Sequence, residues 1–386
     1  MRITYVSTYP PTECGIATYT QYLSNSVANY GKEIRVLAQI GAKGNHVFET
    51  YAPHDKDIAA KLFFHVERHS PDIVHVEHEF GLFGDQRGVQ IVEFLIRCQL
   101  ADTPVVVTLH TVFEDLKYEE KNILQHILNF STAIVVHESF QKEILLQTYE
   151  CPKPIVVIPH GVREVERVKH AKNLLGLEGK QVLLLAGYMR STKNFEKIIK
   201  LMPQLIERNK DLVLLMASRT RINEHSMYKE KLYREIDQMG LKEHVKILYG
   251  KFPQYTLDTI LSAADVMALP YSKGAQSGVL AQAAAMLLPV VTSELMSFKN
   301  WINEVRGGFY ASSDDEYVSH ISHLLQDDDL RTEFQNNIRE NNKKISWTNI
   351  ASRHIKLYRN LLKSPVAGAQ FYFRSESINS GKEILL

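Results

Sequence analysis

The sequence predicts an α/β protein built from two doubly wound domains, each with a parallel sheet. Three observations support this prediction. The chain has 386 residues, more than one hydrophobic core usually serves. Its strand-like runs are continuous stretches of Val, Ile and Leu, which is typical of strands covered on both faces. Strand-like and helix-like segments alternate, and this order starts afresh after residue 161.

The first half is predicted to contain six strands separated by helices. The strand-like runs are 2–7, 34–39, 72–77, 104–109, 132–137 and 154–158. The helix-like segments are 17–29, 55–69, 88–99, 117–130 and 139–149. A stretch rich in turn residues and charges, 159–170, is the predicted hinge.

The second half repeats the pattern. Strands are predicted at 181–186, 211–217, 245–248, 265–269 and 289–292, with a further short run at 307–310. Helices are predicted at 194–208, 224–239, 254–263, 277–287 and 313–326, then at 328–345 and 348–363. Two such halves predict two Rossmann-like domains, with ligands at the carboxyl ends of the strands.

The charge distribution indicates an anionic small-molecule ligand. The net charge is only +1, but residues 1–165 carry −6 and the remainder carries +7. A basic second half favours binding of an anion there. The Lys and Arg residues form no dense block, which argues against a nucleic-acid partner.

Cysteine usage and hydropathy predict a cytoplasmic protein. Cys14, Cys98 and Cys151 are widely spaced, which fits neither a disulfide framework nor a zinc site. The first residues already read as a strand, so no signal peptide is predicted, and the longest apolar stretch, 279–291, is too short to cross a bilayer. The helix over 353–363 carries four cations beside apolar residues. Peripheral contact with a membrane and packing on its own protein both stay open for it.

The stretch 270–294 is the predicted centre of the functional site. A buried strand, 266–269, leads through a small polar loop into a helix that starts near Ser277 and Gly278. The first N–H groups of a helix have no partner within it, and they lie at the positive end of the helix dipole. This strand–loop–helix junction therefore predicts a phosphate site.

A second strand-end loop, 187–194, supplies two cations, Arg190 and Lys193. Arg offers paired planar donors and Lys a point charge, which suits a diphosphate. The alternative is two solvated surface cations, the usual state of these residues. Their position after the first strand of the second half favours binding.

In the first half, titratable side chains follow the predicted strands. His110 comes directly after 104–109, and His75, Glu77, His78 and Glu79 crowd the end of 72–77. Neighbours in a strand alternate between faces, so this crowded run is not expected to bind a metal. The loop 8–16, which contains Glu13 and Gly15, opens the first helix. An ordinary turn set by two prolines and a functional loop both fit it.

Several segments in register resemble the GT-B glycosyltransferases, and most closely the large retaining family 4. They are Gly187 with Arg190 and Lys193, the turn His160-Gly161-Val162, the run from Leu257 to Pro270, and Ser277-Gly278 followed by Gln282-Ala283 and Pro289-Val290-Val291. The resemblance covers nearly all of residues 1–363. It implies two Rossmann-like domains with parallel sheets facing across a cleft and a C-terminal helix that returns to the first domain.

The resemblance also implies roles for individual residues. Arg190, Lys193 and His110 would be catalytic, and His110 would lie near the donor sugar. The donor diphosphate and ribose would contact Gly15, Gln276, Ser277, Gly278, Val279 and Gln282. The nucleobase would lie against Gly250, Lys251 and Phe252, and the acceptor cleft would include Glu13, His78 and Glu79. No metal or other cofactor is expected for this class.

Two glutamates that the family usually carries are replaced here by Gly274 and Gln282. Gln282 can still hydrogen bond with ribose hydroxyls. The loss of the first glutamate affects contacts to the donor sugar, and Gln276 from the same loop is a candidate to replace it.

These observations predict domains at 1–163, which would bind the acceptor, and 164–347, which would bind the donor. A returning helix at 348–364 and a tail at 365–386 complete the predicted organisation. The predicted activity is transfer of a hexose from GDP-mannose or a UDP-hexose to a hydroxyl of a saccharide or glycoconjugate, with retention, in glycan or polysaccharide biosynthesis. A non-catalytic scaffold that binds sugar nucleotides, or a GT-B epimerase or phosphorylase, is the alternative. Oligomeric state is not predicted.

Overall fold

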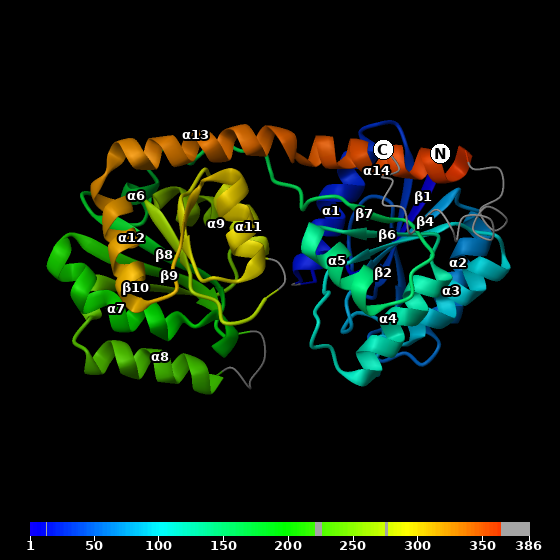
Figure 1. Ribbon diagram of the computed structural model, residues 1–386, viewed down its shortest axis with the longest axis horizontal. Helices are drawn as coiled ribbons and strands as arrows, with labels where there is room; N and C mark the ends of the chain where they lie inside the picture. Colours follow the sequence, from blue (N-terminus) through cyan, green and yellow to red (C-terminus); the bar gives the residue numbers. More distant parts are fainter. Residues whose placement is uncertain (13, 221–225, 275–276, 364–386) are drawn as a thin grey trace. The chain divides into compact units, whose positions relative to one another are not determined.

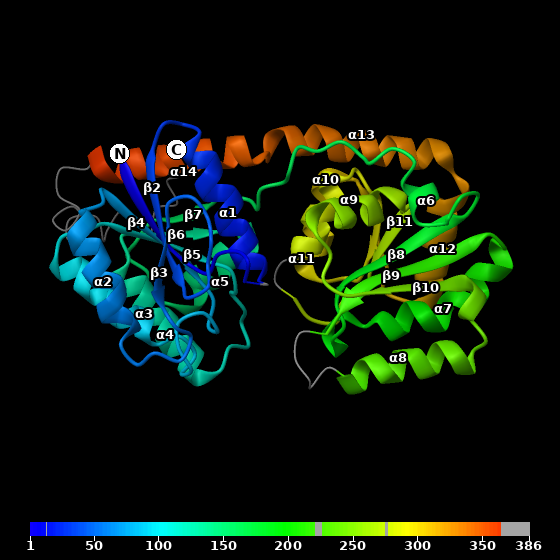
Figure 2. The ribbon, with the colours of Figure 1, turned by 180° about the vertical axis from the view of Figure 1, so that it is seen from behind.

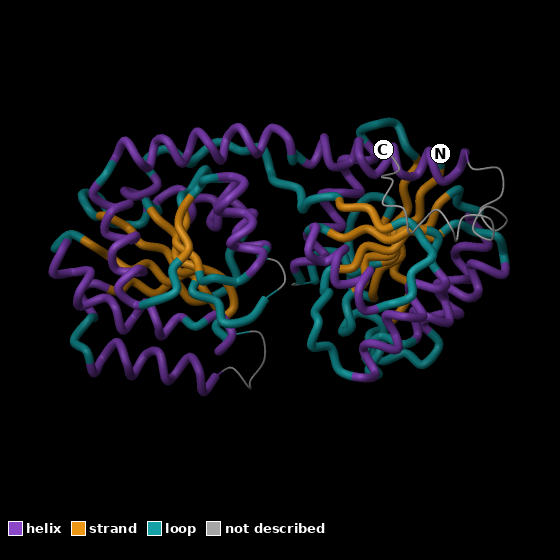
Figure 3. Tube along the Cα trace, viewed as in Figure 1, coloured by secondary structure: helices purple, strands orange, loops and turns teal. Residues whose placement is uncertain are grey.

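The chain forms two compact units in a computed structural model that describes residues 1–12, 14–220, 226–274 and 277–363. Unit 1 consists of Met1–Gly161 together with the segment that begins at Trp347, and unit 2 is Val162–Ser346. Each unit is a parallel sheet with helices on both of its faces (Figure 3), so the predicted class of two Rossmann-like domains is confirmed.

Unit 1 contains a seven-stranded sheet among the described residues, in the order β3-β2-β1-β4-β5-β6-β7. The strands are β1 Arg2–Val6, β2 Glu33–Gln39, β3 Val47–Tyr51, β4 Ile73–His78, β5 Val105–Leu109, β6 Ala133–Val136 and β7 Ile155–Val157. The helices are α1 Gly15–Ala28, α2 Ile58–His69, α3 Gln90–Leu100, α4 Tyr118–Phe130 and α5 Ser139–Thr148. Every predicted strand and helix of this half is present.

The edge strand β3 is absent from the sequence prediction. Its residues VFETY mix apolar and polar side chains without strict alternation, and they are mostly exposed or half-buried. β4 and β5, in contrast, are buried at every position. An edge strand has a neighbour on one side only, so it does not need the continuous apolar run that identifies an inner strand.

The C-terminal helix α14, Trp347–Lys363, belongs to unit 1 and packs against α1 (Figures 1 and 2). Its apolar face is buried in the unit, including Ile350, Ile355 and Tyr358. Its cations Arg353, Lys356, Arg359 and Lys363 are exposed on the other face. The basic amphipathic pattern of this helix is therefore explained by packing on its own unit. None of the helices within the described ranges has the length and apolar character needed to cross a membrane.

Unit 2 contains a six-stranded sheet in its described part, in the order β10-β9-β8-β11-β12-β13. The strands are β8 Gln181–Tyr188, β9 Leu212–Arg219, β10 Val245–Tyr249, β11 Val266–Leu269, β12 Val290–Thr292 and β13 Gly308–Tyr310. The helices are α6 Ala171–Leu174, α7 Phe195–Arg208, α8 Ser226–Gln238, α9 Gln254–Ala263, α10 Gly278–Ala285, α11 Met296–Val305, α12 Asp314–Gln326 and α13 Asp328–Lys344. The helices α6 and α11 are not in the sequence prediction.

The two strands β12 and β13 approach so closely that position 308 requires a glycine. A Cβ at Gly308 would lie 2.0 Å from the carbonyl oxygen of Val290 on the neighbouring strand. Because that atom is backbone, it cannot rotate away. We expect Gly308→Ala to destabilise unit 2 by roughly 1–3 kcal/mol or more through overpacking. Chemical denaturation measures this change.

Gly274→Ala is the matched control for that substitution, since a Cβ there would meet nothing closer than 4.0 Å. Equal stability of the two variants would contradict the close approach of β12 and β13.

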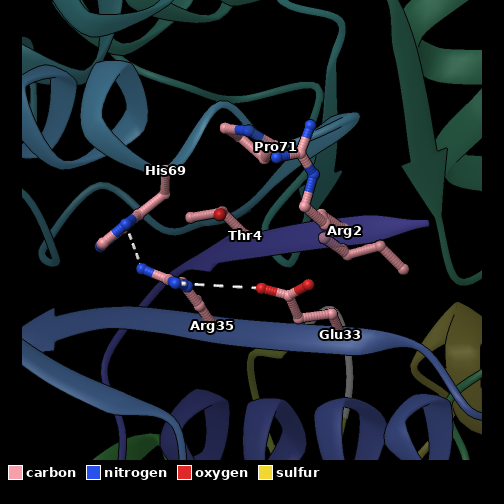
Figure 4. Close-up of a pocket in the computed structure, with 7 residues that line it drawn as sticks. Arg2, Thr4, Glu33, Arg35, His69 and Pro71 are labelled. Atoms are coloured by element: carbon pink, nitrogen blue, oxygen red, sulfur yellow. Dashed lines mark hydrogen bonds and ion pairs between the residues drawn. The ribbon is translucent and has the colours of Figure 1, made fainter.

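A small hollow lies at the amino ends of β1 and β2, away from the carboxyl ends where ligands of such sheets bind (Figure 4). Arg35 fills it with contacts to its own unit: one nitrogen contacts His69 Nδ1 and another lies 3.8 Å from the Glu33 carboxylate. We therefore do not take this hollow as the functional site.

Candidate functional site

The predicted phosphate-binding loops of unit 2 meet at the carboxyl ends of β8 and β11. After β8, residues Ser191–Lys193 form a short 3-10 helix, η1. The backbone N–H of Ser272, in the loop after β11, donates to the carbonyl oxygen of Thr192 at 3.0 Å. Gly187 has φ +113°, and a Cβ there would come within 3.3 Å of the Val279 side chain at the start of α10. The strand end, η1 and the N-terminus of α10 thus form one site.

Lys193 is a buried cation at the centre of this site. Its Nζ lies 3.3 Å from the centroid of the Tyr271 ring, a cation–π contact. Among the described residues, no carboxylate or other acceptor bonds to this Nζ. Burial, reinforced by the neighbouring Arg190 charge, lowers the pKa of Lys193 to about 7. A buried ammonium without a counter-ion favours the arrival of an anion.

Arg190 is exposed and directly precedes η1. Its charge acts on both Lys193 and Tyr271, so all three side chains share one electrostatic neighbourhood. Two neighbouring cations repel each other when the site holds no ligand, and a doubly charged diphosphate would remove that repulsion.

The N-terminus of α10 supplies backbone donors to the same place. Ser277 caps the helix: its Oγ accepts from the Leu280 N–H at 3.2 Å. The amides of Gly278 and Val279 precede any bonded partner within the helix. Gly278 is exposed and Val279 half-buried, so the described residues leave the start of α10 at the surface of unit 2.

Tyr271 joins these parts, and sequence reasoning missed it. Its ring contacts Lys193, and its hydroxyl lies 3.4 Å from Ser277 Oγ, so it connects the buried cation to the helix cap. The side chain is 2% exposed. Its place two residues after β11, opposite a strand-end lysine, could have identified it.

Gln282 lies one turn further along α10 and is held by an ion pair. Arg163 donates to both oxygens of Asp258, at 3.1 and 2.6 Å, and to Gln282 Oε1 at 2.7 Å. Arg has donors only, so the oxygen of the Gln282 amide must face Arg163 and its nitrogen faces away. Sequence reasoning missed both Arg163 and Asp258, which are 95 residues apart.

The turn expected to contact a nucleobase follows the edge strand β10. The Gly250 N–H donates to the carbonyl oxygen of Ser218 at 3.1 Å, Lys251 is exposed, and Phe252 packs partly on the core of unit 2. Beside them Tyr249 is 46% exposed, with Lys229 Nζ 4.8 Å from its ring centroid. This turn presents both an aromatic face and a cation.

In unit 1, His110 is tied to a buried carboxylate. Its Nε2 lies 2.9 Å from Glu77 Oε2, and its ring makes a T-shaped contact with Tyr19 and a tilted contact with His137. Glu77 is fully buried on β4. Burial raises the pKa of Glu77, while hydrogen bonds from His110 and Thr108 act against that rise.

The remaining residues predicted in unit 1 have different environments. His78 is 1% exposed, and burial lowers its pKa to about 3. Glu79 is half-buried and accepts from the Thr111 hydroxyl and from the Phe80 N–H. Gly15 is exposed at the first turn of α1, where a Cβ would meet no atom within 4 Å. Glu13 and Gln276 lie outside the described residues, as does the predicted tail 365–386.

The run from His75 to Glu79 does not come together as a metal-ligand set. No group of three or more His, Cys, Asp or Glu residues in the described part of the chain is arranged to hold a metal ion.

Comparison with known families matches both halves of the chain. The Glycosyltransferase Family 4 model matches residues 14–165, and the model for glycosyl transferases group 1 matches residues 165–344. The second match contains every unit 2 residue described above except Arg163.

Characterised relatives are distant in sequence. A D-inositol 3-phosphate glycosyltransferase of Corynebacterium urealyticum is 22% identical over 256 residues, which cover 63% of this chain and 60% of that protein. A phosphatidyl-myo-inositol mannosyltransferase of Mycobacterium tuberculosis is 23% identical over 291 residues, covering 70% and 71%.

Solved structures share the fold over nearly the whole chain. A sucrose-phosphate synthase from Thermosynechococcus elongatus has a TM-score of 0.76 at 15% identity, covering 94% of this chain and 99% of that one. HepE of Anabaena, solved with UDP-glucose, has a TM-score of 0.72 at 14% identity, covering 94% and 100%. With its two parallel-sheet units, its returning helix and the two family matches in order, the chain belongs to the GT-B glycosyltransferases of the family 4 and group 1 type.

Proposed function

We propose that the protein transfers a hexose from a nucleoside diphosphate sugar to a hydroxyl of a saccharide or glycoconjugate, with retention of anomeric configuration. The observation that carries the proposal is the buried Lys193, beside Arg190 and the open N-terminus of α10. Cations and free amides at one point suit the diphosphate of such a donor. HepE, which has the same fold, was solved with UDP-glucose.

The same groups would perform the chemistry. When the bond between the sugar and the diphosphate breaks, negative charge grows on the leaving phosphate. Lys193, Arg190 and the amides of Gly278 and Val279 would stabilise that charge, which is usually a large term in catalysis. In a front-face reaction the leaving phosphate also takes the acceptor proton, so no protein nucleophile is required. The proposal includes no metal, because these two cations would serve in its place, and it predicts activity in the presence of a chelator.

The sugar donor is tested by nucleotide release. The full chain is incubated with UDP-glucose, GDP-mannose and ADP-glucose, with and without a panel of saccharide acceptors, and released nucleoside diphosphate is measured. Acceptor-dependent release that persists in EDTA supports the proposal, and NMR of the product gives the anomeric configuration. Binding without release across the panel would support a scaffold instead. Release of a sugar phosphate that depends on inorganic phosphate would support a phosphorylase.

We expect Arg190→Ala to weaken nucleoside diphosphate binding by about one to two decades. The loss corresponds to one charge-assisted contact of roughly 1.5–3 kcal/mol. Isothermal titration with UDP and GDP measures it. Arg208→Ala, at the far end of α7, is the matched control and should bind as the unmodified chain does. Unchanged affinity in Arg190→Ala would remove this residue from the site.

A further inference from the structure

A buried carboxylate in unit 1 needs a physical explanation. Glu77 is fully buried on β4, between two neighbouring strands of the sheet. Burying a charged carboxylate is costly unless hydrogen-bond donors surround it. Its Oε2 accepts from His110 Nε2 at 2.9 Å, and its Oε1 lies 3.5 Å from His75 Nε2. Glu77 is buried despite this cost, and its closest donor is a histidine at the end of a strand. This combination indicates that Glu77 and His110 act as a pair.

The contact determines where the proton of His110 lies. An ionised carboxylate can only accept hydrogen bonds, so the nitrogen that faces it must carry hydrogen. His110 therefore has its proton on Nε2. In the neutral ring, Nδ1 is then an acceptor. Among the described residues no side chain or backbone group bonds to that Nδ1.

Other histidines packed nearby have the opposite arrangement. His137, His160 and His354 each place Nδ1 against a backbone carbonyl oxygen, of Ile158, Gly161 and Ile350, at 2.9, 2.7 and 2.9 Å. Carbonyl oxygens only accept, so these three rings carry hydrogen on Nδ1. The tautomer of His110 is thus set by Glu77 and is not a general property of the cluster.

His75 and α14 complete the support of the carboxylate. His75 Nε2 lies 2.7 Å from Thr108 Oγ1 and also faces Glu77, so its hydrogen belongs on Nε2. Its Nδ1 then accepts from the hydroxyl of Tyr358 on α14. The groups that support Glu77, directly or through His75, therefore come from β4, from β5 and the residue after it, and from α14.

We propose that Glu77 is a positioning residue, which fixes the tautomer and orientation of His110 so that Nδ1 accepts a hydrogen bond from a sugar hydroxyl. The inference rests on the proposed function for the identity of that hydroxyl. His110 follows the last residue of β5 and keeps 9% side-chain exposure, whereas Glu77 beneath it has none. Holding the ring from below leaves its other nitrogen for the substrate, and such preorganisation is a large part of catalysis.

The tautomers are tested on the protein alone. In the full chain labelled with 15N-histidine, two-bond nitrogen–proton spectra distinguish the two forms, and single substitutions of histidines assign them. We expect His110 and His75 to carry hydrogen on Nε2, and His137, His160 and His354 on Nδ1. Glu77→Leu should move the hydrogen of His110 from Nε2, wholly or in part. Tyr5→Phe, which removes one buried hydroxyl of the same cluster, should not. His110 with its hydrogen on Nδ1 in the unmodified chain would overturn the proposal, as would an unchanged His110 in Glu77→Leu.

Enzyme activity gives a second test of the positioning role, and this test does not require the Glu77→Leu variant to fold. With whichever sugar nucleotide the unmodified chain turns over, Glu77→Gln should lower kcat by about tenfold to a hundredfold, the effect of one hydrogen bond to a charged group. Its affinity for UDP or GDP should not change. In a His110→Ala background, Glu77→Gln should have no further effect. Unchanged kcat in the single variant, or independent effects in the double variant, would contradict a positioning role. A wrong proposed function can be told apart from a wrong positioning role. In the first case no sugar nucleotide is turned over, although the histidine tautomers can still be those expected.

Discussion

Acid, at a pH between about 6 and 4, is expected to unfold unit 1 while unit 2 stays folded. Four histidines of unit 1 are at most 2% exposed: His75, His78, His137 and His354. Burial lowers the pKa of His354 to about 4 and of His78 to about 3, and it lowers the pKa of His75 and His137 well below the usual value. Burial also lowers the pKa of His160 to about 4, although its side chain keeps some exposure.

The sign follows from where the protons bind. Between the unfolded pKa near 6.5 and the lower folded values, the unfolded chain binds more protons than the folded unit. The stability contributed by these neutral rings is therefore present above about pH 6.5 and is lost as the pH falls. Each of these five rings contributes about 1.4 kcal/mol per pH unit, so together they contribute roughly 7 kcal/mol per pH unit, compared with a typical total stability of about 5–15 kcal/mol.

Other groups packed on the cluster do not reverse this result. Burial raises the pKa of Glu77, so its protonation favours the folded unit in acid, but this is one group against five. Tyr5, Tyr19 and Tyr358 have pKa values raised by burial and stay neutral throughout. Among the described histidines of unit 2, all keep at least partial exposure.

Tryptophan fluorescence measures the two units separately. The chain has two tryptophans, Trp347 in the cluster of unit 1 and Trp301 in unit 2. In Trp301→Phe the remaining tryptophan is Trp347, so the fluorescence reports the unfolding of unit 1. In Trp347→Phe the remaining tryptophan is Trp301, so the fluorescence reports the unfolding of unit 2. His354→Leu should reduce the pH slope of unit 1 stability by about a fifth, since one of the five titrating rings is gone. If both units unfolded at the same pH, well below 4, the buried histidines would not control the acid stability of unit 1.

Substitution of Lys193 is expected to have the largest effect on ligand binding. Lys193→Met keeps the length of the side chain but removes the buried charge, so a bound diphosphate loses its most desolvated partner. We expect UDP and GDP affinity to fall by about a hundredfold, close to 3 kcal/mol. Isothermal titration measures the loss, and full-strength binding by this variant would exclude Lys193 from the site.

The pH dependence of binding tests the same residue independently. The pKa of Lys193 is about 7 in the free protein, and a bound diphosphate would raise it by favouring the charged form. Binding is then strongest below pH 7 and weakens as the pH rises above it, by up to about tenfold per pH unit. UDP-glucose is a suitable probe from about pH 6 to about pH 8.5, because its diester phosphates do not titrate there. Lys193→Arg should bind with little pH dependence, because Arg stays charged.

Local pattern predicted most of the fold because the inner strands are continuous apolar runs. It missed β3, whose residues VFETY have no clear period, and α6, which is only four residues long. It also missed α11, although Phe298, Ile302 and Val305 recur there at helical spacing. The return of α14 to unit 1 came from the family resemblance. It depends on contacts such as Tyr5 with Tyr358, 353 residues apart, which no local pattern contains.

Part of the candidate site follows from the positions of its residues in the chain. Arg190, Lys193, Ser277 and Gly278 follow strand ends or begin a helix, and the structure brings all four together in unit 2. The burial of Lys193 on Tyr271, the Arg163 contact to Gln282 and the Glu77 contact to His110 were not predicted. Each joins segments between 33 and 119 residues apart, so it depends on how the sheets pack.

The return of α14 has a consequence for the order in which the protein folds during synthesis. Domains generally fold as they leave the ribosome, with the N-terminal one first. Here the N-terminal sheet lacks the helix that covers Tyr5 and His75 until residues 347–363 have been made. All of unit 2 is synthesised before then, and its two ends pair with each other through the Val162 N–H and the carbonyl oxygen of Ile345, 2.9 Å apart. The second unit to be translated is therefore the first that can be completed.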